Sequence, residues 1–464
     1  MSDPAAAPQL RRSMGFFDLV LFVVLTSFGI MWFAKAGEAG AVGVTLWIVA
    51  GLVFYLPLAL CVIVLSARYP GEGGLYCWSQ RSFGDFAGFI TGWTYWACIL
   101  PFLPGVLYFI AGSALFLGGD RWMGLIKDPA YFITVSLLCF ALTTALNIIG
   151  LNVGKWLHNA GALGTWLPAL GLMALGFISW ARHGSVTDLS AERFMPAFNL
   201  KEAALWPILV MSLTGLEAAS ILGDEIKDTQ RRLPIALVFA AILVIVTMVA
   251  GTLAVLAAPP TVEQEGAPAF MGAFENVSSR AGVGGLLPIV AVLVVVGHLG
   301  KVSAWSATAA RLPLVAGVDK KLPAVFARLH PRWGTPYVAL LVQAVIVAVL
   351  IVIGAAGTST EGAYNLFLDL TAVLTLVPFL FLFAAAIKVQ CGESGPGRMQ
   401  TPLGRGVAAL LLVVGLATTA VSMILAVIPP EQEEYKALHV AKVAGLSGLV
   451  VGCGVAIYFL GRKR

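Results

Sequence analysis

Apolar runs of about 20 residues recur from one end of this chain to the other. A helix of that length crosses the hydrocarbon core of a bilayer, which is about 30 Å thick. Hydrophobic residues make up 59% of the chain and charged residues only 11%, whereas a soluble domain carries about a quarter charged residues. Within a helix every backbone polar group can find a partner in the same segment. The sequence therefore predicts an all-α polytopic membrane protein.

We predict twelve transmembrane helices. The predicted spans are 16–38, 43–67, 86–118, 131–150, 156–181, 202–222, 234–258, 285–316, 337–356, 363–387, 404–428 and 438–460. Residues 1–15 lack the basic, apolar and small-residue pattern of a cleaved signal peptide, so we expect the first span to be retained. Residues 1–15 and 461–464 are expected to form short tails.

The basic residues predict the orientation. Lysine and arginine gather in cytoplasmic loops of membrane proteins. With the N-terminus inside, eighteen of the 29 basic residues fall in cytoplasmic segments and nine in outer segments. This ratio favours cytoplasmic termini and an inner (plasma) membrane location. It also accounts for the net charge of +5 without a nucleic-acid partner.

The six cysteines do not follow a metal-ligand spacing, and no outer loop holds two of them. We interpret them as small buried apolar residues. The sequence thus predicts neither a metal site nor a cofactor, and it makes no prediction about an oligomer or an accessory subunit. The long outer connection, about 259–284, has apolar residues spaced as on a helix at Phe270, Met271, Phe274 and Val277. Such a helix can cap an outer vestibule or simply pack on the bundle.

Two spans contain matching interruptions. Span 1 includes 25-LTSFGIMW-32 and span 6 includes 213-LTGLEAAS-220. Glycine weakens a helix by about 1 kcal/mol relative to alanine, and threonine or serine hydroxyls can satisfy backbone groups freed by a local break. Interrupted helices in corresponding positions are typical of a transporter site between two inverted repeats. The predicted repeats are 16–181 and 202–387, followed by two more helices in 404–460.

Three stretches carry a family resemblance. They are 66-SARYPGEGGLYCWSQRSFGDFAGFITGWTYW-96, 215-GLEAASILGDEIKDTQRRLPIAL-237 and 300-GKVSAWSATAARLPLVAGVDKKLPAVFARLHPRWGTP-336. The chain resembles transporters of the amino acid–polyamine–organocation (APC) superfamily, such as bacterial amino acid permeases and antiporters and the light-subunit amino acid transporters. The resemblance implies a 5+5 inverted repeat with discontinuous helices 1 and 6, plus two C-terminal helices. It also implies transport of amino acids or related amines by alternating access.

One departure concerns the first interruption. The family usually has Gly-x-Gly there, where backbone groups receive the substrate carboxylate, whereas this chain reads Ser27-Phe28-Gly29-Ile30-Met31-Trp32. The loss of the second glycine suggests altered substrate chemistry.

A broken helix exposes backbone groups that are costly to leave bare in hydrocarbon and are tolerated beside a wet cavity. A helix N-terminus attracts a carboxylate, and the other broken end attracts an ammonium, so a zwitterion fits such a site. The predicted backbone clamp consists of Ser27, Phe28, Gly29, Ile30, Leu213, Thr214 and Gly215.

Two ionisable residues lie inside predicted spans near the clamp. Glu217 follows the second interruption, and acids in membrane spans usually face a cavity or a partner. It is predicted to act in proton coupling or gating, the alternative being a hydrogen bond to the unwound backbone of helix 1. Lys301 lies where sodium-coupled members of this fold place hydroxyl ligands, so by resemblance its ammonium can replace a sodium ion. The alternative is a lysine that snorkels to the membrane boundary.

Further residues are assigned roles by position or resemblance. Trp305 shares a helix face with Lys301, and Trp305 and Tyr95 are expected to pack against the substrate or simply between helices. Met211 lies where some relatives have a gating tryptophan, and Phe379 matches a gating aromatic with Thr371 two turns before it. Asp369 is predicted to pair electrostatically with Lys301, and His298 is expected to serve helix packing. The charged loop 223–233 is predicted to close the inner side of the transporter.

The sequence favours a secondary transporter over three other classes. A membrane sensor commonly needs a cytoplasmic output segment, an enzyme needs clustered catalytic groups, and a channel does not need a closed midplane site. We expect sodium-independent transport by proton coupling or exchange. Neutral amino acids are the preferred substrates, followed by acidic amino acids and amines such as polyamines.

Overall fold

The computed structural model describes residues 14–69, 73–197, 199–222, 229–257, 267–357, 360–392, 404–429 and 436–461. The regular elements in these ranges are helices, and alone or joined end to end they form eleven segments that are long and apolar enough to cross a membrane. The protein is therefore a multi-pass, all-α membrane protein, as the apolar runs predict. The crossing helices lie within a few residues of the predicted spans.

The first half of the chain forms spans one to five. Its helices are α1 (Phe16–Ser27), α2 (Met31–Gly37), α3 (Val42–Ala50), the π-helical turn η1 (Gly51–Tyr55), α4 (Leu56–Arg68), α5 (Leu75–Phe83), α6 (Asp85–Ala114), η2 (Leu115–Leu117), α7 (Asp120–Met123), η3 (Gly124–Lys127), α8 (Pro129–Ile149) and α9 (Leu151–His183). A short 3₁₀ turn, η4 (Ala191–Phe194), follows on the connection to the second half.

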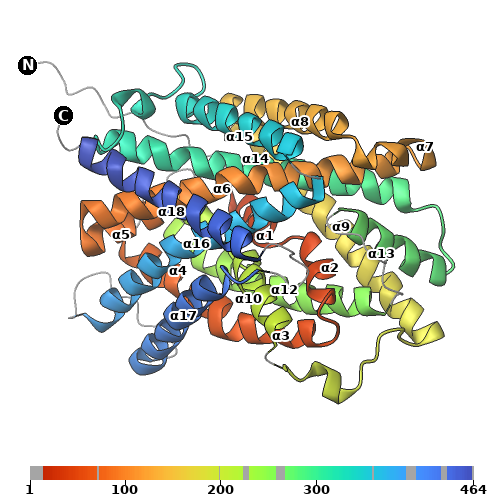
Figure 1. Ribbon diagram of the computed structural model, residues 1–464. Coiled ribbons are helices and arrows are strands. Elements are labelled where there is room, and N and C mark those ends of the chain that lie inside the picture. The colour runs from red at the N-terminus through yellow and green to blue at the C-terminus, as the bar shows by residue number, and fades with distance from the viewer. Residues whose placement is uncertain are drawn as a thin grey trace, which may run out of the picture.

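The second half repeats the succession of long helices and adds two. Its helices are α10 (Leu200–Ser212), α11 (Ala218–Ile221), α12 (Thr229–Leu256), α13 (Ala267–Arg280), α14 (Leu287–Val318), η6 (Ala324–Ala327), α15 (Tyr337–Gly357), α16 (Thr360–Cys391), α17 (Arg405–Leu425) and α18 (Lys436–Gly461). In Figure 1, α5 lies at one end of the bundle, and α7 and α13 lie at the other.

The predicted sixth span is the one that is not among the eleven crossing segments. It is formed by α10 and α11, which are separated at Leu213–Glu217, so neither piece reaches across a bilayer alone. The first span is broken as well, between α1 and α2. Both predicted interruptions are therefore present, and the two discontinuous helices are confirmed.

Helices α6, α9, α14 and α16 form the centre of the bundle, with α14 packed on α9 and α6, and α16 packed on α6. In the most apolar window of α6, 89% of the residues are buried, against 22% for α18. The C-terminal pair thus lies outside the core, where α17 packs on α16 and α18 packs on α6. Trp93 Nε1 of α6 donates to the backbone oxygen of Val450, 2.8 Å away, and so holds α18 in place.

Glycines bring α9 and α14 close together. A Cβ atom on Gly161 would lie 2.7 Å from Gly300 Cα, and one on Gly297 would lie 2.7 Å from Thr165 Oγ1. Small residues let membrane helices approach until their backbones touch. Since Gly300 precedes Lys301, this contact fixes the point at which the lysine side chain leaves α14.

Helix α13 belongs to the predicted outer connection. The four apolar residues predicted to share its inner face are buried: Phe270, Met271, Phe274 and Val277. They pack α13 on α9, α6 and α2. The helix is therefore a packed part of the bundle. Residues 258–266 of the connection and 223–228 of the predicted inner gate lie outside the described residues.

Candidate functional site

The first break covers three residues. Phe28 is extended (φ −119°, ψ 136°), and α2 begins at Met31. Phe28 N still donates to Val24 O at 2.9 Å, and Trp32 N donates to Gly29 O at 3.1 Å. Among the described residues, the backbone N–H groups of Gly29, Ile30 and Met31 have no acceptor. The break therefore leaves bare backbone donors, which the sequence predicts for this position.

The second break depends on Gly215. Its φ is +120°, a conformation that L side chains rarely adopt. A Cβ atom there would also lie 2.6 Å from the backbone oxygen of Thr26, so the two breaks are in contact. Thr26 Oγ1 lies 3.0 Å from Gly215 O, across 189 residues of sequence, and 3.0 and 3.1 Å from the carbonyl oxygens of Phe22 and Val23 in its own helix. The hydroxyl carries one proton, so the freed carbonyl of Gly215 shares this donor with the last turn of α1.

Glu217 joins the second break to α6. Its side chain is fully buried, and its two carboxylate oxygens lie 3.0 and 2.9 Å from the N–H of Gly215. Tyr95 donates its hydroxyl to Glu217 Oε1 at 2.6 Å. The alternative in which Glu217 bonds the unwound backbone of helix 1 is therefore wrong: the backbone partner is two residues away, because the reversed φ of Gly215 turns its N–H toward the carboxylate.

Lys301 reaches the first break from α14. Its side chain is 2% exposed, and its ammonium donates to the backbone oxygen of Phe28. A Cβ atom on Gly29 would lie 3.1 Å from Lys301 Nζ. The side chain thus points into the bundle rather than to a membrane boundary, and the snorkelling alternative is wrong.

The predicted partner and neighbour of Lys301 lie elsewhere. Asp369 Oδ2 lies 3.7 Å from His439 Nε2, while the acceptor of the Lys301 ammonium is a backbone carbonyl. The ring of His298 packs on Phe109 with centroids 4.5 Å apart and the ring planes tilted by 31°, and its Nδ1 lies 2.8 Å from Val294 O. His298 therefore serves helix packing, as predicted.

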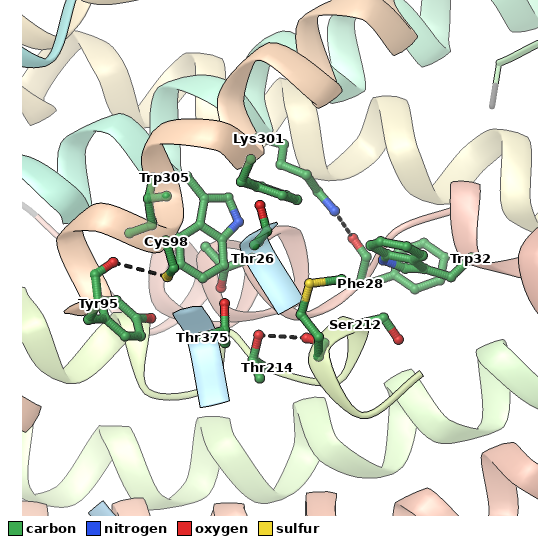
Figure 2. Close-up of a pocket in the computed structure, with 14 residues that line it drawn as sticks. Thr26, Phe28, Trp32, Tyr95, Cys98, Ser212, Thr214, Lys301, Trp305 and Thr375 are labelled. Carbon is green, nitrogen blue, oxygen red and sulfur yellow. Dashed lines mark hydrogen bonds between the residues drawn. The ribbon is translucent and has the colours of Figure 1, made fainter. Parts of the chain in front are cut away.

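A cavity lies beside the two breaks (Figure 2). The space between its atoms is about 480 Å³, a figure that includes the part open to solvent. Its lining residues are Thr26, Phe28, Trp32, Tyr95, Cys98, Ile99, Phe102, Met211, Ser212, Thr214, Lys301, Trp305, Thr371 and Thr375. They come from α1, α2, α6, α10, α14 and α16 and from both breaks, so no single segment forms the pocket.

The structure brings half of the predicted site residues to this cavity. Those that line it are Phe28, Tyr95, Met211, Thr214, Lys301, Trp305 and Thr371. Those that do not are Ser27, Gly29, Ile30, Leu213, Gly215, Glu217 and Phe379. Some of the second group contact lining residues from behind. Phe379 packs on Phe54 with ring centroids 5.9 Å apart and lies 6.5 Å from the ring of Tyr95.

Seven lining residues were not predicted: Thr26, Trp32, Cys98, Ile99, Phe102, Ser212 and Thr375. Helical spacing offered a signal for three of them. Cys98 and Phe102 follow Tyr95 by three and seven positions, and Thr375 follows Thr371 by four, so each shares a face with a predicted residue. Thr26 and Ser212 directly precede the predicted clamp.

The lining is aromatic and carries one charge. Trp305 lies 5.8 Å from Phe102 and 6.3 Å from Tyr95, measured between ring centroids. Lys301 is the one lysine, arginine, aspartate or glutamate among the lining residues. The hydroxyls of Ser212, Thr214 and Thr371 donate to carbonyls of their own segments at 2.6–2.7 Å. Within the described part of the chain, no group of three or more His, Cys, Asp or Glu side chains is placed to hold a metal.

Comparison with known proteins gives consistent matches over the whole chain. A family model described as "Amino acid permease" matches residues 14–448. An uncharacterized transporter of Legionella pneumophila subsp. pneumophila is 29% identical over 444 residues, which cover 95% of this chain and 95% of the relative. An uncharacterized transporter of Mycobacterium tuberculosis is 26% identical over 426 residues, which cover 90% of both chains.

A solved structure shares the fold. The crystal structure of MhsT in complex with L-phenylalanine matches with a TM-score of 0.62 at 14% sequence identity, over 90% of this chain and 99% of that chain. At this identity the likeness concerns the arrangement of helices.

Proposed function

The chain belongs to the amino acid permease family of the APC superfamily, and on that premise we propose that it is a secondary active transporter of amino acids. Transport proceeds by alternating access, with residues 16–181 and 202–387 acting as two inverted repeats. Both termini lie in the cytoplasm, and the protein resides in the plasma (inner) membrane. The excess of basic residues in the inner loops supports this orientation.

One observation carries the proposal: two broken helices touch each other beside a cavity. Thr26 Oγ1 and Gly215 O link the breaks at 3.0 Å, and the first break presents unpaired N–H groups. Bare backbone in a membrane is tolerated where it lines a cavity. In this proposal the substrate site consists of Phe28 and Thr214 of the predicted clamp, which line the cavity, together with Tyr95, Met211 and Trp305. The other clamp residues shape the two breaks.

Among amino acids, we take neutral ones as preferred substrates over those with a cationic side chain. Its walls are aromatic, and the absence of an acid from its lining leaves a second cationic group on the substrate without a partner. The complex of MhsT with L-phenylalanine concerns that protein, and it supports amino acids with large apolar side chains as the first substrates to test here.

We assign coupling and gating to four residues. Lys301 binds the carbonyl of Phe28 with its ammonium and thereby takes the place of a sodium ion at the first break. Glu217 accepts hydrogen bonds while ionised and donates one when protonated, so its contacts with Gly215 and Tyr95 are suited to proton-dependent movement. Both gating residues lie on α16. Thr371 lines the pocket, and Phe379 packs against Tyr95.

The experiment is uptake of radiolabelled L-phenylalanine, L-leucine and L-alanine into proteoliposomes that hold the purified protein. We expect uptake that persists when sodium is replaced by choline and that responds to a proton gradient or to the same amino acid inside. In Lys301→Thr, sodium should stimulate uptake, because a hydroxyl and the Phe28 carbonyl can then bind the ion. Saturable binding without uptake of any amino acid would instead identify a sensor.

A further inference from the structure

The ammonium of Lys301 has unused hydrogen-bonding capacity. A lysine ammonium carries three donors and no acceptor. One donor goes to the backbone oxygen of Phe28. Within the described residues, Lys301 has no carboxylate within ion-pair distance, and its side chain is 2% exposed. Two N–H groups of a buried cation are thus left at the wall of the cavity.

Trp305 adds a second unused donor on the same side. Its indole N–H, which can only donate, is buried and has no partner among the described residues. Trp305 follows Lys301 by four positions on α14, so both side chains leave the same face of the helix. In Figure 2 the indole nitrogen points toward the side of the pocket on which Lys301 and Phe28 lie.

Negative charge is missing from the same wall. The lining contains one cation and no acid. Glu217, the nearby buried acid, is turned away and engaged by Gly215 N–H and Tyr95. A charge that is buried in a membrane protein without an opposite charge is costly. A solute with net negative charge therefore complements this cavity, whereas a zwitterion leaves the charge of Lys301 unbalanced.

The break carbonyl that could accept from a substrate ammonium is already bonded to the protein. Phe28 O is the break carbonyl that faces the lysine, and it already accepts from an ammonium that belongs to the protein. A substrate therefore does not need its own amino group at this carbonyl. What it does need is an acceptor for the two remaining N–H groups of Lys301 and for the indole N–H of Trp305.

We propose that the pocket also binds and transports small organic monocarboxylates that lack an amino group, with the carboxylate held by Lys301 and Trp305. The hydrocarbon body lies against Tyr95, Ile99 and Phe102, which line the cavity. This inference rests on the proposed function, because it extends the substrate range of the same site. Amines without a carboxylate are excluded, since they would place a second cation beside Lys301.

The experiment compares solutes that share one skeleton. The three probes are L-phenylalanine, 3-phenylpropionate and phenethylamine, which present a zwitterion, an anion and a cation on the same phenylethyl body. The set L-leucine, 4-methylpentanoate and isopentylamine repeats the test with a smaller body. Binding to the purified full-length protein is measured by thermal shift, because a ligand stabilises the folded state according to its concentration and affinity, and uptake is measured in proteoliposomes.

We expect each anion to bind at least as tightly as the amino acid of the same skeleton, and each amine to give no shift. In Lys301→Gln, which keeps an amide donor for Phe28 O but loses the charge, the ratio of anion affinity to amino acid affinity should fall at least about tenfold. Trp305→Phe keeps the ring and removes the indole donor, so it should lower the same ratio by a smaller factor. Lys442→Gln is the matched control, because Lys442 is exposed on α18.

The outcomes separate this inference from the proposed function. Uptake of the amino acids with neither binding nor uptake of the anions would overturn the inference and leave the proposed function standing. Uptake of the anions without uptake of any amino acid would overturn the proposed amino acid transport and support the inference about monocarboxylates. An unchanged affinity ratio in both Lys301→Gln and Trp305→Phe would also overturn the inference, because it would place the carboxylate elsewhere.

Discussion

The two breaks that meet at the cavity are held open in different ways. The first is held from a distance, by an ammonium on α14 that lies 273 positions further along the chain. The second is held locally, by a carboxylate two residues beyond the glycine, with Tyr95 as an additional donor. A cation therefore satisfies a bare carbonyl at one break, and an anion satisfies a bare N–H at the other.

The glycines of the two breaks are constrained in different ways. Gly215 needs a positive φ and also touches backbone of the other break. Gly29 does not adopt a positive φ, and its neighbours are the side chains of Trp32 and Lys301. The second break is thus fixed by backbone geometry, and the first by side chains that can move. This difference predicts unequal tolerance to substitution.

The largest effect is expected for Gly215→Ala. A Cβ atom there would meet Thr26 O at 2.6 Å and Thr26 C at 2.7 Å, and a non-glycine residue in this conformation costs about 1–3 kcal/mol before any clash. We expect a lower melting temperature and loss of amino acid uptake. Gly452→Ala on α18 is the control, because a Cβ atom there would have no neighbour within 4 Å. Near-normal uptake by Gly215→Ala would show that the contact between the breaks is not needed.

A smaller effect is expected for Glu217→Gln. The glutamine side chain keeps one acceptor oxygen, but its NH₂ group replaces the second oxygen that now accepts from the protein. A buried polar group that is left without a partner in this way costs about 1–3 kcal/mol. We expect slower uptake, by about tenfold for each 1.4 kcal/mol lost in the transport step, and a flatter dependence of the rate on pH.

Glu202→Gln tests whether this pH effect is specific. Glu202 lies in the first turn of α10 and accepts from Asn199 Nδ2 at 3.1 Å. Its substitution should affect stability but leave the pH profile in place. If Glu217→Gln kept the full pH dependence of the wild type, the second break would have a structural role and coupling would reside elsewhere.

The smallest effect is expected for Gly29→Ala. Its Cβ atom would lie 2.8 Å from Trp32 Nε1 and 3.1 Å from Lys301 Nζ, so two side chains must shift but no backbone is displaced. Overpacking of this kind costs about 1–3 kcal/mol, and we expect the low end of that range, with uptake reduced less than in the other two variants. The measurement is melting temperature and uptake for all three. An effect larger than that of Gly215→Ala would reverse the comparison between the breaks.

Much of this fold could be predicted from the sequence, because lipid leaves few choices. A run of twenty apolar residues in a bilayer has to be a helix that satisfies its own backbone, so the spans could be assigned to within a few residues. The second break was also visible, since Gly215 and Glu217 are two residues apart in an otherwise apolar run.

The composition of the pocket wall could be predicted only in part. Tyr95, Trp305 and Lys301 stood out as polar or aromatic residues in apolar spans, whereas Thr26, Cys98 and Ser212 resemble ordinary helix residues until neighbouring helices are placed around them. The proposed ion pair of Lys301 with Asp369 failed for the same reason: two residues in different spans can be matched by charge but not by position.

The sequence by itself determined that this chain lies in a membrane, where its spans begin and end, and which two of them break, because these properties depend on the local hydrophobicity and conformational preference of the chain. The tertiary structure alone decided that the breaks touch each other, that Lys301 reaches Phe28, and that Glu217 turns to Gly215 and Tyr95. These contacts depend on close approaches between helices, such as that of Gly161 to Gly300. Helices that are distant in sequence approach each other in this way only in the assembled bundle.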